Sequence, residues 1–155
     1  MSASGKGCRC GSNVAYAECC RPFHRGEREA PTAEALMRSR YSAFALGEVE
    51  YLWRTLATSN PDRDHPRDAL IAALRHTCSR LKFMGLRVHE SEEARVLYQA
   101  RVFEKGRDVS FLELAEFERE GDGWRYAVGK VKGAVGRALD DAATIRDFEA
   151  GGDEH

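Results

Sequence analysis

Between residues 31 and 81, apolar side chains recur every three or four positions, which is the spacing of one face of an α-helix. The run AEALMRSRYSAFALG follows Thr32, a residue type that caps helix N-termini, and stops at Gly47, a common helix terminator. The run EVEYLWRTLA predicts a second helix, and a third begins near Pro66 after an NPDRDHP loop. The apolar faces of the three predicted helices comprise, in order, Leu36, Met37, Tyr41 and Phe44; Val49, Leu52, Trp53 and Leu56; and Leu70, Ile71 and Leu74.

From about residue 82 the apolar side chains alternate with polar ones, which is typical of β-strands with one buried face. The runs LKFMGLRVHE and ARVLYQARVFE predict two strands, and a third spans about residues 108–118. Gly121-Asp122-Gly123 indicates a hairpin before the last strand, WRYAVGKV. The aligned positions of the last three strands are Val96, Tyr98, Ala100 and Val102; Val109, Phe111, Glu113, Ala115 and Phe117; and Trp124, Tyr126 and Val128. Three helices followed by a four-stranded antiparallel meander predict an α+β fold, with the helices packed on one face of a curved sheet.

Composition divides the chain into three regions. Residues 1–30 are rich in Cys, Gly and Arg, residues 31–131 hold the predicted helices and strands, and residues 132–155 are rich in Gly, Ala and Asp. The last region is acidic, and its run RALDDAATIRDFEA is only loosely periodic. We therefore expect a small N-terminal unit, one α+β domain, and a C-terminal tail that is either flexible or a short helix.

Charge and hydrophobicity narrow the class of protein. Of the 155 residues, 43% are hydrophobic and 32% are charged, which suits one globular domain with a buried core. The net charge of −1 gives no electrostatic argument for nucleic-acid binding. No apolar run approaches the ~18 residues of a membrane span, and no apolar segment follows the first basic residues as in a secretory signal. We therefore expect a cytoplasmic protein with reduced thiols and no membrane partner.

Four of the five cysteines lie within thirteen residues, in the pattern Cys-x-Cys-x8-Cys-Cys formed by Cys8, Cys10, Cys19 and Cys20. Thiolates are preferred ligands of Zn²⁺, which takes four of them in a tetrahedron. A shell made only of protein ligands leaves no open position for water, so the pattern predicts one structural zinc ion rather than a catalytic one. Nearby basic residues would moderate the negative charge of the tetrathiolate, namely Lys6, Arg9, Arg21 and Arg25.

Other uses of these thiols stay open at this point. Two disulfides would suit an oxidising compartment, and a redox pair would normally show a CxxC motif that this chain lacks; the third alternative is unrelated free thiols. His24 lies four residues after Cys20 and offers a substitute ligand. Because four thiols are already available, we expect His24 to be a surface residue.

The stretch CRCGSNVAYAECC resembles the SEC-C motif, a short zinc knuckle found at the C-terminus of the SecA translocase ATPase and in many small bacterial proteins. The following segment, APTAEALMRSRYSAFALGEVEYL, resembles the YchJ-like family, in which an LMRSRY-x-AF helix introduces an NTF2-like cone. This resemblance covers roughly residues 8–131. It implies an SEC-C zinc knuckle at residues 1–30 and an NTF2-like α+β domain at residues 31–131.

The chain departs from the family pattern in several places. Arg9 replaces the usual proline and Asn13-Val14 replaces Gly-Lys, changes that affect the stiffness of the turn and not the ligands. The His-Pro pair usual after the second helix is absent, as are both arginines of an ERSRF-like strand, where this chain has Glu113 to Phe117. An acidic tail stands where relatives often carry a second SEC-C motif.

One carboxylate, Glu113, stands on an otherwise apolar strand face, and the resemblance implies that such a residue lies near the cavity of the cone. Burial there would suit it to ligand binding or acid–base work, whereas the alternative is pairing with Arg95 or Arg101 on the neighbouring strand. Arg38 and Arg40 would similarly bind an anionic ligand or an acidic partner, or else pair with nearby acidic residues, Glu34 or Glu48.

The remaining candidates point to structure rather than catalysis. His76 and His89 have no partner at catalytic spacing, and Cys78 resembles a small buried apolar residue. We expect the large aromatic residues to form the core or line a cavity, namely Trp53, Phe83, Tyr98, Phe111 and Trp124. No catalytic residue is identified.

Three functions remain, in this order. The first is a module that binds a protein partner through the zinc knuckle, as the resemblance to SecA implies. The second is a small-molecule-binding or enzymatic pocket that uses Glu113 inside the cone. The third, and the least favoured, is ribosome or nucleic-acid association through the basic residues of the knuckle, with a steep salt dependence.

Overall fold

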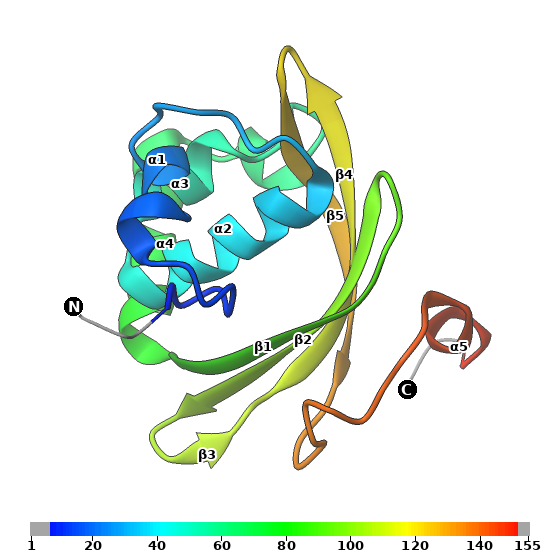
Figure 1. Ribbon diagram of the computed structural model, residues 1–155. Coiled ribbons are helices and arrows are strands. Elements are labelled where there is room, and N and C mark those ends of the chain that lie inside the picture. The colour runs from blue at the N-terminus through cyan, green and yellow to red at the C-terminus, as the bar shows by residue number, and fades with distance from the viewer. Residues whose placement is uncertain (1–6, 152–155) are drawn as a thin grey trace.

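The computed structural model describes residues 7–151, so Lys6 lies outside the described residues (Figure 1). The helices are α1 (Arg21–His24), α2 (Ala33–Leu46), α3 (Val49–Arg54), α4 (Arg67–Arg80) and α5 (Ile145–Ala150), with 3-10 turns η2 (Tyr16–Glu18) and η3 (Pro61–Asp64). The predicted ends of α2 are confirmed, because the Thr32 hydroxyl accepts the Ala35 N–H at 3.0 Å and Gly47 adopts φ 80°. No helix within these residues is long and apolar enough to cross a membrane.

The strands form one antiparallel sheet in the order β1-β2-β4-β5, with β3 paired to β2. Their bounds are β1 (Lys82–Ser91), β2 (Arg95–Glu104), β3 (Arg107–Asp108), β4 (Phe111–Glu120) and β5 (Gly123–Gly133). The sheet curves around α2, and α1 to α4 cover its concave side (Figure 1). The predicted α+β class, with helices on one face of a curved meander, is confirmed.

A β-bulge in β5 changes which side chains face the concave side. Phe117 pairs with Tyr126 and Glu116 pairs with Val128, so Ala127 is an extra residue in the strand. The inserted residue reverses the alternation, and Val128 is consequently 49% exposed on the outer side. The predicted alignment of Val128 with Trp124 and Tyr126 is therefore wrong.

The main core lies between α2 and the concave face of the sheet. Leu36 from α2 and Leu52 from α3 meet Val96, Ala100 and other apolar residues of the sheet, and all four are almost fully buried. Helix α3 is shorter than predicted because the chain after Arg54 runs beside β5, where Ala57 N–H donates to the Tyr126 carbonyl at 2.8 Å.

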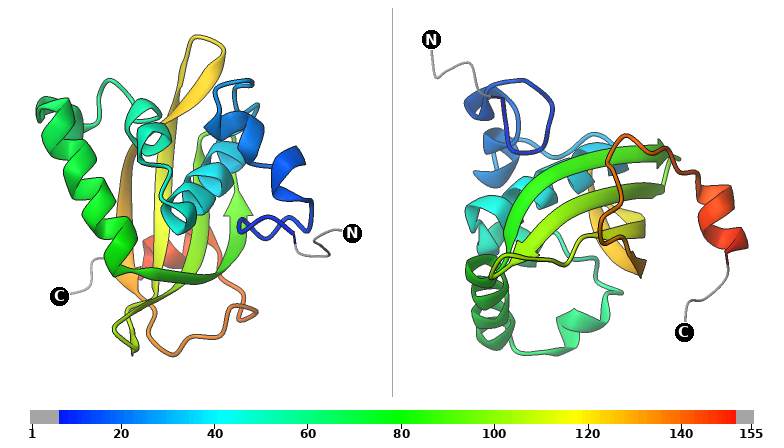
Figure 2. Two further views of the ribbon diagram at one scale, coloured as in Figure 1. Left: turned by 90° about the vertical axis from the view of Figure 1, so that its left-hand side faces the viewer. Right: turned by 90° about the horizontal axis from the view of Figure 1, so that it is seen from below.

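The segment after β5, residues 134–150, is a C-terminal strap that lies on the opposite side of the sheet from α1 to α4 (Figures 1 and 2). Leu97 and Leu114 face this side and pack against Ile145 and Phe148. The Glu90 carboxylate also accepts the Ile145 N–H at 2.7 Å. The end of the chain thus includes the short helix α5 and buries the outward-facing residues of β2 and β4.

A group of polar side chains between the strap and the sheet predicts that acid weakens the attachment of the strap. The Gln99 side-chain oxygen accepts a hydrogen bond from Arg137 at 2.8 Å, so His89 Nε2, 3.0 Å away, is the donor in its contact with the same oxygen. Nδ1 of His89 is buried and has no hydrogen-bond partner among the described residues. Burial lowers the pKa of His89 below 6.5, and Arg87 and Arg137 lower it further, against opposing effects of Gln99 and Asp141.

The unfolded chain therefore binds this proton more readily than the folded protein. The contribution of neutral His89 to stability is complete above pH 6.5 and is lost as the pH falls below it. We expect the free energy of unfolding to drop more between pH 8 and pH 5 in the wild type than in His89→Gln, measured by urea denaturation. The exposed His76→Gln serves as the control and should follow the wild type. Equal pH dependence in all three proteins would contradict the prediction.

Candidate functional site

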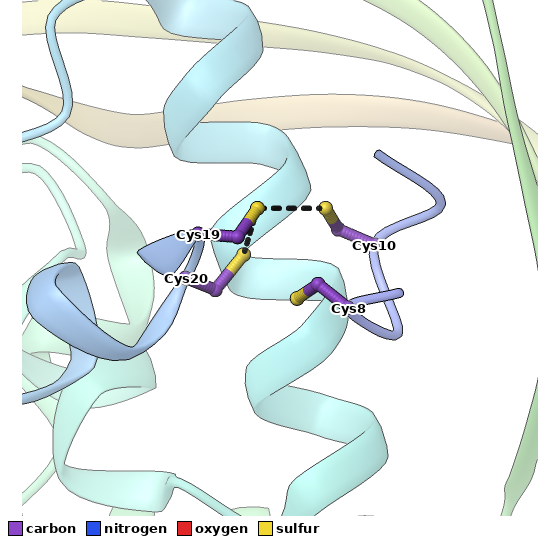
Figure 3. A group of neighbouring side chains, drawn as sticks. All are labelled: Cys8, Cys10, Cys19 and Cys20. Atoms are coloured by element: carbon purple, nitrogen blue, oxygen red, sulfur yellow. Dashed lines mark hydrogen bonds between the residues drawn. The ribbon is translucent and has the colours of Figure 1, made fainter. Parts of the chain in front are cut away.

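The four N-terminal cysteines converge from two segments. Cys8 and Cys10 come from the loop before η2, whereas Cys19 and Cys20 come from the turn between η2 and α1 (Figure 3). All four Sγ atoms lie within 4.8 Å of one another, with Cys10 to Cys19 at 3.6 Å and Cys19 to Cys20 at 4.0 Å. A tetrahedron with Zn–S bonds of about 2.3 Å has S–S edges of about 3.8 Å. The cluster therefore fits a tetrathiolate metal ion in size and in ligand chemistry.

The loop that carries Cys8 and Cys10 is held by local backbone bonds. The Cys8 N–H donates to the Val14 carbonyl at 2.7 Å, and the Gly11 N–H donates to the Cys8 carbonyl at 3.0 Å. The turn needs positive φ at Gly11 (87°) and at Asn13 (67°), residue types that tolerate this region. These backbone bonds thus place both thiols on one tight turn.

The electrostatics of the cluster favour a cation. Cys8, Cys10 and Cys20 are buried, and burial raises the pKa of Cys19 to about 11. Hydrogen bonds from Cys20 and Cys8 lower the pKa of Cys10, and the bond to Cys10 in turn raises the pKa of Cys20. Because the thiols share protons in this way, ionising all of them requires compensating positive charge, which a divalent metal ion supplies.

His24 is not the surface residue that the sequence predicts. Only 6% of it is exposed, and its Nδ1 lies 2.7 Å from the Tyr16 hydroxyl while its Nε2 donates to the Ser39 carbonyl at 2.8 Å. Burial lowers its pKa. Both ring nitrogens are therefore occupied in joining the knuckle to α2, and neither is available to a metal.

Arginines attach the knuckle to the domain. Arg38 donates to the Cys10 carbonyl at 2.9 Å and pairs with Glu34 at 3.0 Å, the ion pair expected from the sequence. Arg9, predicted to moderate the charge of the metal site, donates to the Phe83 carbonyl on β1 at 2.8 Å. The knuckle is therefore held against α2 and β1 by bonds to its own backbone and side chains.

A cavity of about 280 Å³ lies on the concave side of the sheet, between α2, α4 and strands β2, β4 and β5. Most of its wall is apolar: Met37, Tyr41, Phe44, Phe83, Phe111 and Phe117. Three of the aromatic residues expected in the core or at a cavity, Phe83, Tyr98 and Phe111, line it. Trp124 belongs to the core, and Trp53 is partly exposed between Arg63 and Arg67.

Glu113 lies at the polar end of this cavity and is 7% exposed. The Tyr98 hydroxyl donates to one carboxylate oxygen, and the Tyr126 hydroxyl donates to the other at 2.5 Å. The expected alternative, pairing with Arg95 or Arg101, is wrong, because Arg95 binds Glu92 and Glu149 while Arg101 is exposed. Tyr98 faces the same side as Glu113 in the register of β2 and β4, which explains their contact.

Arg40 completes the polar end, which we call the polar cluster of Arg40, Tyr98, Glu113 and Tyr126. Its guanidinium lies 4.9 Å from the centre of the Tyr126 ring and donates to the Thr55 hydroxyl at 2.7 Å. The expected pair with Glu48 is not found within residues 7–151. Burial lowers the pKa of Arg40, and burial also raises the pKa values of both tyrosines. The sequence offered Arg40 and Glu113 as separate candidates and missed the two tyrosines as their partners.

Comparisons with known proteins agree with this architecture. The model of the YchJ middle NTF2-like domain matches residues 32–129. A UPF0225 protein of Deinococcus radiodurans is 47% identical over 114 residues, covering 74% of this chain and 78% of the relative. The UPF0225 protein YchJ of Shigella dysenteriae is 36% identical over 135 residues, covering 79% and 81%.

Two solved structures are similar in fold. A SEC-C motif containing protein from Rhodopseudomonas palustris superposes with a TM-score of 0.69 at 30% identity, covering 79% of this chain and 96% of that one. Another SEC-C motif containing protein, from Psychrobacter arcticus, gives a TM-score of 0.59 at 22% identity, covering 88% and 83%. The expected combination of an SEC-C cysteine cluster with an NTF2-like domain is confirmed, and the chain belongs to the YchJ family of UPF0225 proteins.

Proposed function

We propose that this protein is a small-molecule-binding protein whose ligand occupies the cone, and that one structural zinc ion in the knuckle braces the helix that lines it. The observation that carries the proposal is a buried carboxylate, Glu113, held by two tyrosine hydroxyls in an otherwise apolar cavity of about 280 Å³. A few fixed polar groups inside an apolar concavity are the usual composition of a ligand site. A core without a ligand role would more simply fill this space with apolar side chains.

The knuckle supports the pocket through α2. Arg38 holds the Cys10 carbonyl on one side of this helix, while Arg40, Tyr41 and Phe44 line the cavity on another. Zinc is the metal that best suits four thiolates, and its closed shell would supply no chemistry beyond cross-linking the two segments. The metal ion thus stabilises the knuckle, and the cone binds the small-molecule ligand.

The pocket is tested with naphthalene as an apolar probe and with two tryptophan variants of β5. Val131 lines the cavity and is 61% exposed, so Val131→Trp should obstruct it without disturbing the core. Val128 is 49% exposed on the opposite face, so Val128→Trp is the matched control. We expect saturable shifts of backbone amide resonances around the cavity in the wild type and in Val128→Trp, and their loss in Val131→Trp. Binding that is the same in all three proteins, or absent from the wild type, would contradict the pocket.

The partner-binding function expected first from the sequence stands as a second candidate. Arg21, Arg25 and Arg28 are exposed on or after α1, and none has an ion-pair partner within the described part of the chain. Such a group suits a protein with an acidic surface. The double variant Arg21→Glu/Arg25→Glu should abolish a specific chemical cross-link between this protein and such an acidic partner protein. The metal content of the variant should be unchanged. A nucleic-acid partner would instead show a steep loss of binding with salt.

A further inference from the structure

Glu113, Tyr98 and Tyr126 of the polar cluster present hydrogen-bond acceptors to the cavity rather than hydroxyl donors, while Arg40 supplies N–H donors. Tyr98 and Tyr126 each have one O–H, and each donates it to a different oxygen of Glu113. Both hydroxyl protons are therefore used within the cluster, and a carboxylate at Glu113 has further lone pairs but no proton to donate. What this part of the cluster offers to a ligand is therefore the remaining lone pairs of Glu113 and of the two phenol oxygens.

The charges of the polar cluster are already balanced. The guanidinium of Arg40 lies 4.9 Å from the centre of the Tyr126 ring, and the hydroxyl of the same tyrosine donates to Glu113, so one positive and one negative side chain share this end of the cavity. Within residues 7–151, these are the charged side chains that line the cavity. An anionic or a cationic ligand would thus bring an unbalanced charge into a largely apolar cavity, at a desolvation cost. A neutral ligand avoids this cost.

The rest of the cavity is shaped by aromatic rings. The ring centre of Phe83 lies 5.7 Å from that of Tyr41, in an edge-to-face arrangement, and 5.7 Å from that of Phe44, in a stacked one. The ring centres of Phe111 and Tyr98 are 6.1 Å apart, again edge to face. Ring faces and edges of this kind favour planar aromatic partners. A volume of about 280 Å³ limits the occupant to a small molecule.

We propose that the cone takes a neutral aromatic molecule of one or two rings that donates a hydrogen bond, from a hydroxyl or a ring N–H, to the acceptors of Glu113, Tyr98 and Tyr126. This inference rests on the proposed function of the cone as a ligand pocket and names the chemical class of its ligand. The hydrogen bond to a charged acceptor makes the site selective for ligands with a donor group. Packing of the ligand ring against the aromatic wall contributes affinity.

The test uses probes that share one ring system and differ in the head group. Binding of 2-naphthol, 2-methoxynaphthalene and 2-naphthoate to the full chain is measured by calorimetry or by amide resonance titration. We expect 2-naphthol to bind about tenfold or more tighter than 2-methoxynaphthalene, which accepts but cannot donate, and tighter than anionic 2-naphthoate. In Glu113→Gln the preference for 2-naphthol over the methyl ether should shrink to about threefold or less.

The probe series on the wild type decides the question even if Glu113→Gln fails to fold. Equal affinity for 2-naphthol and its methyl ether, or a preference for 2-naphthoate, would overturn the assigned ligand class while leaving the pocket itself in place. An unchanged preference in a folded Glu113→Gln protein would overturn the role of the polar cluster. Failure of every naphthalene probe, including naphthalene itself, would overturn the proposed function together with this inference.

Discussion

Cys10→Ser should abolish the proposed metal binding and lower the melting temperature by roughly 10 °C. Cys10 is 1% exposed, and its Sγ lies 3.6 Å from that of Cys19, so serine removes a thiolate from the centre of the cluster. A ligand that binds only the folded state at a thousand times its Kd contributes ~4.1 kcal/mol. For a chain of this size, each kcal/mol corresponds to about 2–4 °C. Native mass spectrometry of protein purified without added metal or chelator measures the occupancy, and calorimetry measures the melting temperature.

Cys78→Ser is the matched control for this experiment. Cys78 lies on α4, outside the four-cysteine cluster, and burial raises its pKa as expected for a thiol packed among apolar groups. The control should keep one zinc per chain and lose little stability. A wild-type protein whose four cluster cysteines are free thiols without metal, or one whose mass is lower by two disulfides, would refute the zinc centre. The shape of the cone would then not depend on a metal ion in the knuckle.

Gly129→Ala should destabilise the protein by about 3 kcal/mol and abolish binding of 2-naphthol. A Cβ at position 129 would lie 1.8 Å from a carboxylate oxygen of Glu113 and 2.8 Å from the Tyr126 hydroxyl. The carboxylate must therefore move, which breaks its buried bonds to Tyr98 and Tyr126. Overpacking and the loss of buried hydrogen bonds each cost on the order of 1–3 kcal/mol. Urea denaturation measures the stability, and titration with 2-naphthol measures the pocket.

Gly133→Ala provides the control on the same strand. A Cβ at Gly133 meets no atom within 4 Å, and its backbone does not adopt the positive φ that favours glycine. Its stability should stay within about 0.5 kcal/mol of the wild type, and its affinity for 2-naphthol should be unchanged. If the two alanine variants behaved alike, the close approach of β5 to Glu113 would have no energetic consequence, and the polar cluster would not be held as described.

Local periodicity predicted the helices and strands well, and its failures arise from contacts between segments that are distant in the sequence. The bounds of α2 follow from a capping threonine and a terminating glycine, both visible in the sequence. The error at Val128 arises from the bulge at Ala127, which depends on pairing with β4 and leaves no mark on the alternation of β5 itself. The back face of the sheet was similarly missed, because Leu97 and Leu114 are buried by a segment from the end of the chain.

The sequence by itself determined the cysteine cluster, the α+β architecture and the family. The ligand pattern is local, because all four cysteines lie within thirteen residues. Local turns are therefore enough to bring their Sγ atoms within 4.8 Å of one another, namely those of Cys8, Cys10, Cys19 and Cys20. Only the tertiary structure decided the pocket. Its polar cluster joins one residue from each of α2, β2, β4 and β5, and the curvature and register of the sheet bring them together. No spacing along the chain encodes such a contact, because a buried carboxylate is stabilised by whichever donors packing places beside it.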